Sequence, residues 1–254
     1  MTMTKDAIQY LQESGINPED RLVNFDNDER WLAFDNSGQA KEILPRVFNA
    51  NEPIRLNTLT GLVNYIKANI ERIDSQLILH IEDERSIRLT GTLEIDGSRE
   101  ILATAGAIVP RFMFGEWYDM ESFNIALQSK FVDKRVENFD DDRSILLRVV
   151  GNTQEENIKT TGDNGVSQAV TIKQGVNSAD VLVPNPVLLA PYRTFLEVEQ
   201  PSSLFVFRMK DGPRAAIFEA DGGAWRNQAI VNIREYLKEE LSVEIHAQKI
   251  TILA

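Results

Sequence analysis

Two pairs of carboxylates in the C-terminal part of the chain have a spacing that suits acid–base or metal chemistry. Glu197 and Glu199 alternate in one segment, and Glu219 and Asp221 alternate just before two consecutive glycines. Residues two apart in an extended segment point to the same face, so each pair can bind Mg²⁺ or Ca²⁺ or share proton transfer. The more ordinary alternative is a solvated strand edge or ion pairing with arginines: Arg193, Arg208, Arg214 and Arg226.

Aromatic residues gather in two segments that a ligand or a partner can use. One runs from Phe112 to Tyr118 and the other from Tyr192 to Phe207. Exposed rings can stack on nucleic-acid bases, whereas packing in a core or between subunits is the commoner use. Together with the carboxylates they give the candidate ligand-binding residues: Tyr192, Arg193, Glu197, Glu199, Glu219, Asp221 and Trp225.

Other residue types that carry chemistry are scarce. The chain has no cysteine and two histidines, His80 and His246, which lie far apart in apolar patterns typical of strands. Disulfides, thiolate zinc sites and cysteine nucleophiles are therefore excluded. No glycine-rich phosphate loop and no nucleophile elbow occurs in the sequence. We expect no metal and no cofactor, and we favour a non-enzymatic protein, although an enzyme stays open.

Length and charge limit the class of protein further. The 254 residues suit one large domain or two small ones, and the net charge is −12 at pH 7. An acidic surface repels nucleic acid at long range, so non-specific DNA binding is not expected as the main activity. The negative net charge still allows a local basic groove. The N-terminus lacks the apolar core of a signal peptide, and no long apolar run occurs, so we expect a cytoplasmic protein without membrane spans.

Hydrophobic periodicity predicts the elements that position these residues. A helix is expected to begin at Asn57 or Thr58, and its apolar side runs at helical spacing to Ile73. Antiparallel strands are expected to follow and to pack on that helix: 77–81, 87–95 and 100–109. Asp96-Gly97 is expected to form a hairpin turn within this meander.

The other elements alternate between helices and strands on both sides of this region. They are a helix over 4–14, a hairpin over 21–34, helices over 118–131 and 141–150, a hairpin over 155–173, strands over 204–209 and 215–218, a helix over 226–241 and a last strand over 243–253. The fold class expected is α+β, with antiparallel sheets, packed helices and room for two lobes.

Pro110 is the best candidate for a boundary between parts of the chain. It separates three expected regions: 1–56, a helix and hairpin segment of unknown role; 57–110, the helix with its meander; and 111–254, a C-terminal α+β region. The alternative is that 57–254 forms one domain, because the segments on both sides of Pro110 are apolar.

Several runs of sequence, taken together, identify a family. They are LTGLVNYIK (59–67), PRFMFGEW (110–117), FNIALQSKFV (123–132), DNGVSQAVTIKQG (163–175), LAPYRTFLEVEQP (189–201) and IFEADGGAWR (217–226). These runs resemble the YfdQ-like family of phage and prophage proteins, a domain of unknown function, over roughly residues 57–242. The resemblance implies an accessory product of a tailed-phage genome, encoded among early, recombination or replication genes. It implies no catalytic residues.

These observations lead to a main functional hypothesis and several alternatives. The main one is a phage accessory protein in the host cytoplasm that acts by homo-oligomeric assembly or by binding host or phage proteins. One alternative is single-stranded nucleic-acid handling beside a phage recombinase, which needs a basic groove. Another is a metal-dependent enzyme that uses Glu219 and Asp221. A structural role in the virion is the weakest of the four.

Overall fold

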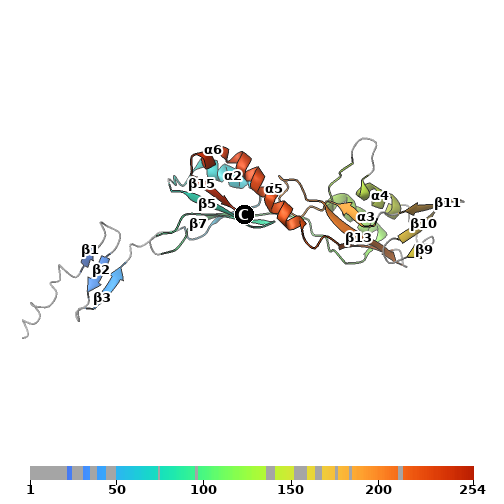
Figure 1. Cartoon of the computed structure of the whole chain (residues 1–254), viewed down its shortest axis with the longest axis horizontal. Coiled ribbons are helices and arrows are strands. Elements are labelled where there is room, and N and C mark those ends of the chain that lie inside the picture. Colours follow the sequence, from blue (N-terminus) through green and yellow to red (C-terminus); the bar gives the residue numbers. More distant parts are fainter. Residues whose placement is uncertain are drawn as a thin grey trace, which may run out of the picture.

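The computed structural model describes the following residues: 22–24, 31–34, 39–43, 50–73, 75–94, 97–135, 141–151, 159–163, 168–174, 177–182, 185–210 and 214–254. The helix expected over 4–14 lies outside them. Most of the described chain forms two lobes, and helix α5 (Trp225–Glu240) runs from one to the other (Figure 1). The expected α+β class, with mostly antiparallel sheets and packed helices, is confirmed.

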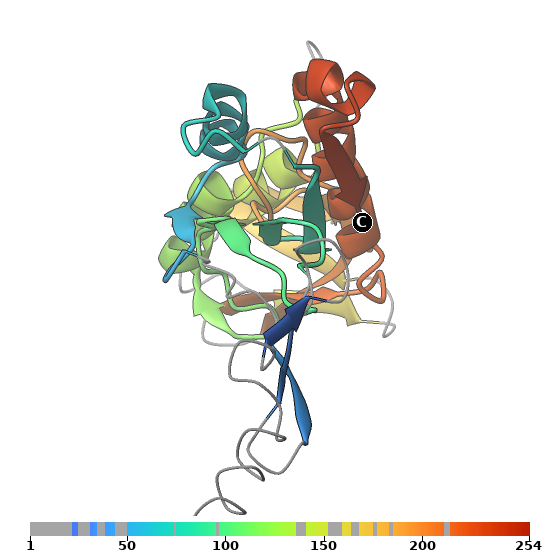
Figure 2. The ribbon, with the colours of Figure 1, turned by 90° about the vertical axis from the view of Figure 1, so that its left-hand side faces the viewer.

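The first lobe is a five-stranded sheet with helices on one side (Figure 2). Its strands, in spatial order, are β15 (Ile250–Leu253), β5 (Leu77–Asp83), β6 (Ser86–Thr90), β7 (Ile101–Gly106) and β4 (Ile54–Leu56). The central three form the expected antiparallel meander, and β15 and β4 join its two edges in parallel. Leu62 of α2 (Leu59–Ala68) and Ile233 of α5 share one core with Leu79 of β5.

Helix α2 begins where the sequence predicts it but ends earlier. Thr58 is its N-cap, because Oγ1 of Thr58 accepts the backbone N–H of Gly61 at 3.0 Å. Asn69 ends the helix in the left-handed conformation, with a φ of 42°, and its side-chain oxygen accepts the N–H of Ile73. Ile70 therefore leaves the apolar side of the helix and is exposed.

The second lobe is a four-stranded antiparallel sheet that packs against two helices. Its elements are β12 (Val187–Leu189), β13 (Ser203–Lys210), β14 (Arg214–Glu219), β8 (Tyr118–Asp119), α3 (Met120–Lys130) and α4 (Asp142–Gly151). Phe123 and Leu127 of α3 are fully buried in one core with Phe205 and Phe207 of β13. This packing is the one expected from the apolar side of the predicted helix over 118–131.

The C-terminal segment carries the chain back from the second lobe to the first. Helix α5 follows β14. Near its C-terminal end, Leu237 and the following Leu241 pack in the core of the first lobe. The strand expected over 243–253 is wrong in its first half, because α6 (Ser242–His246) precedes β15. His246 thus lies on a helix, with Nδ1 2.6 Å from the carbonyl oxygen of Ser242. The domain boundary at Pro110 stays a prediction.

Two further three-stranded sheets complete the described structure. Their strands are β1 (Leu22–Asn24), β2 (Trp31–Phe34), β3 (Ala40–Ile43), β9 (Lys159–Asp163), β10 (Gln168–Gln174) and β11 (Asn177–Leu182). The expected hairpins correspond to the antiparallel pairs β1–β2 and β9–β10, and the third strand of each sheet is an addition. Within the described ranges, no helix is long and apolar enough to cross a membrane.

Candidate functional site

A buried arginine organises the place where the segment between β12 and β13 meets the start of α5. We call Arg193, Ser203, Glu219, Asp221 and Trp225 the Arg193 cluster. Arg193 is 3% exposed, and its Nη1 donates to Oε1 of Glu219 at 3.1 Å. The guanidinium carbon lies 3.9 Å from the centroid of the Trp225 ring, so the planar cation stacks on the indole. Four of the seven candidates from the sequence therefore come together here, with Ser203 added.

The cluster extends to Asp221 through a hydroxyl group. Nη2 of Arg193 donates to Oγ of Ser203, and the Ser203 hydroxyl in turn donates to the Asp221 carboxylate. Oδ1 of Asp221 also accepts the backbone N–H of Gly223 at 3.0 Å. Burial by itself would raise the pKa of Asp221, but the hydrogen bonds from Ser203 and Gly223 and the charge of Arg193 hold this pKa below its usual value. Burial lowers the pKa of Arg193 to about 10, which leaves it charged near neutral pH.

The two glycines after Asp221 make the turn that starts α5. Gly222 and Gly223 have φ values of 63° and 84°, in the region that favours glycine. A Cβ atom at Gly223 would lie 2.5 Å from Nη1 of Arg226. The turn places Trp225 over Arg193, so its glycines serve the packing of the protein's own chain.

Asp221 gives the cluster a defined response to acid. Because its folded pKa is depressed, the carboxylate stabilises the folded state above about pH 4, and this contribution is lost as the pH falls through the folded pKa. We expect Asp221→Asn to be less stable than the parent at pH 7 and to lose less stability between pH 7 and pH 3. Chemical denaturation at the two pH values measures both effects. If the parent and Asp221→Asn lose the same free energy of unfolding in acid, the assignment is wrong.

Protein donors already occupy the carboxylates of the cluster. Glu219 accepts a hydrogen bond from Arg193, which is one of the arginine pairings that the sequence left open. Asp221 accepts hydrogen bonds from Ser203 and from a backbone N–H. In the part of the chain that the structure describes, no group of three or more His, Cys, Asp or Glu side chains could hold a metal ion. This geometry gives the metal-dependent enzyme no support.

Glu197 lies in a turn and Glu199 just after it, so the two residues do not form an extended strand, and they contact different lobes. Oε1 of Glu197 accepts the backbone N–H of Thr60, in the first turn of α2, at 3.2 Å. Oε1 of Glu199 lies 3.1 Å from Nζ of Lys134 in the second lobe. The carbonyl oxygen of Glu199 accepts Nδ2 of Asn232 on α5 at 2.8 Å. The two carboxylates therefore contact separate groups and do not form one site.

Gln200 is a buried polar residue that sequence reasoning missed. Its Oε1 accepts the backbone N–H groups of Arg193 at 2.9 Å and Thr194 at 3.2 Å, and its Nε2 donates to the carbonyl oxygen of Phe195 at 2.8 Å. Gln200 thus fixes the backbone from which the Arg193 side chain enters the cluster. A single glutamine in an irregular segment carries no sequence signal for this role.

A pocket of about 300 Å³ lies between the two lobes, and we call it the junction pocket. Its lining combines cations with aromatic and proline side chains: Arg85, Val109, Pro110, Arg111, Phe112, Phe114, Lys130, Pro191, Tyr192 and Arg193. Tyr192, the remaining candidate from the sequence, is part of this lining. Arg85, Arg111 and Lys130 were missed, because residues from a turn, a loop and the end of a helix share no spacing in the sequence.

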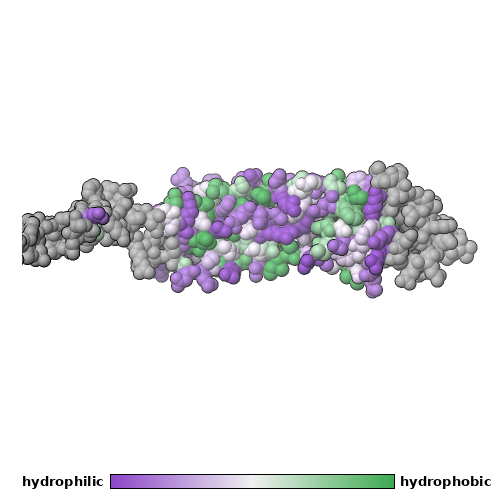
Figure 3. Space-filling view, turned by 90° about the horizontal axis from the view of Figure 1, so that it is seen from below, coloured by the Kyte–Doolittle hydropathy of each residue, from purple (hydrophilic) through white to green (hydrophobic). Residues whose placement is uncertain are grey.

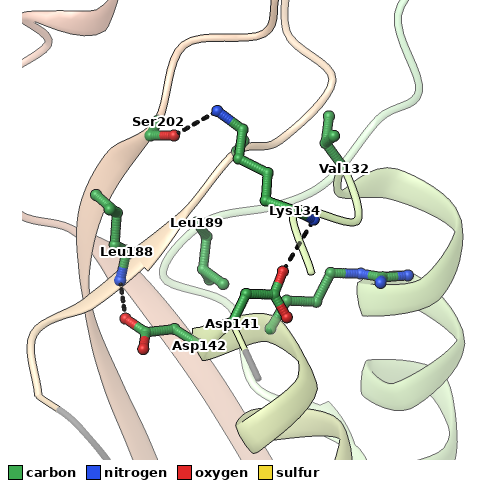
Figure 4. A pocket seen from close by; sticks show the side chains of 9 residues that line it. Val132, Lys134, Asp141, Asp142, Leu188, Leu189 and Ser202 are labelled. Atoms are coloured by element: carbon green, nitrogen blue, oxygen red, sulfur yellow. Dashed lines mark hydrogen bonds between the residues drawn. The ribbon is translucent and has the colours of Figure 1, made fainter. Parts of the chain in front are cut away.

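A second pocket, of about 280 Å³, lies at the start of α4, and several of its polar lining groups hydrogen-bond to one another (Figure 4). Oδ2 of Asp141 accepts the backbone N–H of Lys134 at 3.0 Å, and Oδ2 of Asp142 accepts that of Leu188 at 2.6 Å. Nζ of Lys134 donates to Oγ of Ser202 at 2.8 Å. These charged groups stabilise the packing of α4 against β12, so this pocket is the weaker candidate.

Most rings of the two aromatic segments are used in the core of the second lobe. Phe112 stacks on Tyr118 with their ring centroids 5.1 Å apart, and Phe114 stacks on Phe205 at 5.2 Å. Base stacking would require these faces to be free. Core packing, the commoner alternative for these segments, is therefore what the geometry shows.

A scan against protein-family models, a search of curated proteins and a search of solved structures each gave no match to this chain.

Proposed function

We propose that this protein is a phage or prophage accessory protein that acts in the host cytoplasm by binding protein, in the first place a second copy of itself. The resemblance of residues 57–242 to the YfdQ-like family supports the phage context. The carboxylate pairs, which are engaged within the protein, favour binding over catalysis. An apolar surface on the second lobe supports this mode of binding.

This surface is the side of the four-stranded sheet that faces away from α3 and α4. Residues 203–209 of β13 alternate, and the odd-numbered ones are buried on the helix side. On the other side, Leu204 is 42% exposed and its cross-strand partner Leu188 is 53% exposed. Val206 and Phe218 are cross-strand partners on the same side. We call these four residues the outer sheet face.

The outer sheet face has an apolar centre with charges at one end, as protein interfaces do. Lys210 and Arg214 are cross-strand partners beyond Val206, and Nζ of Lys210 lies 4.3 Å from the centroid of the Trp117 ring. In the view of Figure 3, hydrophobic residues form separate patches on both lobes, with hydrophilic residues running between them. A local apolar patch of this kind marks an interaction site rather than a general property of the surface.

The edge of this sheet is less open than its face. β12 is an edge strand, and the backbone N–H of Leu188 donates to Asp142 (Figure 4). A carboxylate on an edge N–H competes with the addition of a strand from another chain. Pairing of two sheets face to face is therefore favoured, and a second copy suits this pairing because an apolar centre is complementary to itself about a two-fold axis.

Leu204→Lys and Leu188→Lys test this mode of binding. Each places an ammonium group in the centre of the proposed interface, where an unpaired charge is costly. We therefore expect the dissociation constant of the assembly to rise at least about tenfold. Light scattering during size-exclusion chromatography, at several protein concentrations, measures the mass.

The matched control is Leu253→Lys, which changes a leucine that is 47% exposed on β15 of the first lobe. Its mass should equal that of the parent. If all three variants keep the mass of the parent, the outer sheet face is not the contact.

A further inference from the structure

The junction pocket has an electrostatic character that the chain as a whole lacks. Four of its ten lining residues are cationic and none is acidic, although the net charge of the chain is −12. A concave site lined by one sign of charge concentrates ligands of the opposite sign. The pocket is therefore suited to an anion in a protein that otherwise repels anions.

Backbone carbonyl groups hold the cations of the pocket in place. Nε of Arg85 donates to the carbonyl oxygen of Arg193 at 3.0 Å, and Nζ of Lys130 donates to that of Arg111 at 2.6 Å. The carbonyl oxygen of Lys130 in turn accepts the N–H of Tyr192 at 3.0 Å. A carbonyl acceptor orients a cationic side chain without neutralising its charge, so these contacts build a site and leave it positive.

The carboxylates around the pocket do not balance its cations. Oε1 of Glu84 lies 3.9 Å from Nε of Arg85 and 3.7 Å from Nε of Arg226, so two arginines share one carboxylate. Within the described ranges, neither Arg111 nor Lys130 forms an ion pair with an acidic side chain. An excess of positive charge therefore remains at the mouth of the pocket.

Arg193 supplies the buried wall of the pocket. Its Nη1 is paired with Glu219, whereas its buried Nε has no hydrogen-bond partner among the residues that the structure places. A buried donor nearly always has a partner, and water or a ligand provides one where the protein does not. Because this Nε atom is buried away from solvent, Arg193 adds its charge to the wall of the pocket and no free donor.

The remaining walls are flat and apolar. Phe112 and Phe114 stack on Tyr118 and Phe205 in the core, so the apolar surface left for a ligand ring comes from Pro110, Pro191 and Tyr192. The volume of about 300 Å³ is at the lower end of the range for small-molecule sites. Guanidinium and ammonium groups together are the usual partners of phosphate oxygens, and flat apolar walls suit a planar ring.

We propose that the junction pocket binds a small molecule that carries a phosphate group and a planar ring, of the size of a nucleoside monophosphate. Arg111 and Lys130 contact the phosphate, and Pro110, Pro191 and Tyr192 contact the ring. Arg85 comes from the turn between β5 and β6 of the first lobe, and Lys130 ends α3 of the second. A ligand in this pocket therefore lies against both lobes, and its binding stabilises the folded chain.

Calorimetric titration of the full chain with adenosine monophosphate, adenosine and inorganic phosphate tests this proposal. We expect saturable binding of the monophosphate with one site per chain, binding of adenosine and of phosphate that is at least about tenfold weaker, and a rise in the melting temperature with the monophosphate. Arg111→Gln and Lys130→Gln should each weaken binding of the monophosphate by about tenfold. Arg111 is exposed and Lys130 is half-buried without contact to an acidic side chain among the described residues, so we expect both variants to fold, which circular dichroism verifies.

Arg55→Gln and Lys249→Gln are the matched controls, because they remove exposed cations outside the pocket and should leave binding unchanged. Absence of binding at millimolar monophosphate overturns the proposal, as does equal affinity in the two pocket variants and the parent. Inorganic phosphate that binds as tightly as the monophosphate overturns the part of the proposal that concerns the ring. A short oligothymidylate that binds where the monophosphate does not would assign the pocket to a nucleic-acid backbone and likewise overturn it. The site is separate from the outer sheet face, so either proposal can fail alone.

Discussion

Replacing Arg193 with methionine is expected to lower the free energy of unfolding by about 3 kcal/mol, within the range for breaking a buried ion pair from one side. Methionine retains much of the apolar volume but none of the donors. Glu219 then loses its cation, and the Ser203 hydroxyl loses the donor that connects it to Arg193. Glu219 is partly exposed and regains some water, which keeps the loss at the lower end. Chemical denaturation at pH 7 measures it.

Arg234→Met is the control for this change. Arg234 lies on the exposed side of α5, with Nε 3.0 Å from Oε1 of Glu235. Exposed ion pairs contribute little, so we expect a loss below about 0.5 kcal/mol. If Arg193→Met costs no more than Arg234→Met, the Arg193 cluster does not hold α5 against β13 and β14.

Trp225→Ala is expected to lower the free energy of unfolding by about 3–5 kcal/mol. Trp225 is 4% exposed, and the guanidinium carbons of Arg193 and Arg226 lie 3.9 Å and 5.0 Å from its ring centroid. The Nε1 atom of Trp225 is buried and has no hydrogen-bond partner in the described structure. Trp225→Phe therefore removes no hydrogen bond, keeps a ring for the cation and should cost only about 1 kcal/mol.

Trp117→Ala serves as the comparison, because Trp117 packs edge to face on Phe218 at 6.2 Å on the outer sheet face and is only half-buried. Its loss should be about 1 kcal/mol. Denaturation of all three variants under the same conditions gives the comparison. A Trp225→Phe protein as unstable as Trp225→Ala would show that stacking on Arg193 is not what the indole contributes.

The helices of this fold could be predicted because residues close in the sequence determine where they begin and end. Thr58 caps α2, and Oδ1 of Asp119 accepts the backbone N–H of Ser122 at the start of α3 at 2.8 Å. The apolar sides of α3 and α5 then follow at helical spacing. These signals depend on residues three or four apart, which a single sequence displays.

The errors lie where the deciding partner is remote. Leu241, Val243 and Ile245 alternate as in a strand, but Leu241 and Ile245 are also one helical turn apart, and both pack against the core of the first lobe. A short apolar run fits either period, and tertiary packing decides between them. The parallel pairing of Ile250 with Leu77 joins opposite ends of the chain and has no local signal at all.

The candidate site was predictable in part for the same reason. The run 217–226 holds Glu219, Asp221 and Trp225 within a few residues, and its pairing with Arg193 was among the alternatives that the sequence left open. The junction pocket was not predictable, because its cations lie on separate elements that only the packing of the two lobes brings together. Long-range placement of charge, unlike capping or periodicity, leaves no pattern in one sequence.

Native mass spectrometry of the purified parent protein, without added ligand and over a range of micromolar concentrations, shows whether the chain associates with itself. We expect a defined homo-oligomer, built from two-fold pairs, whose population falls on dilution and falls further in Leu204→Lys. A monomer at every concentration would contradict it, because a protein that acts through the outer sheet face on a second copy of itself must associate under these conditions.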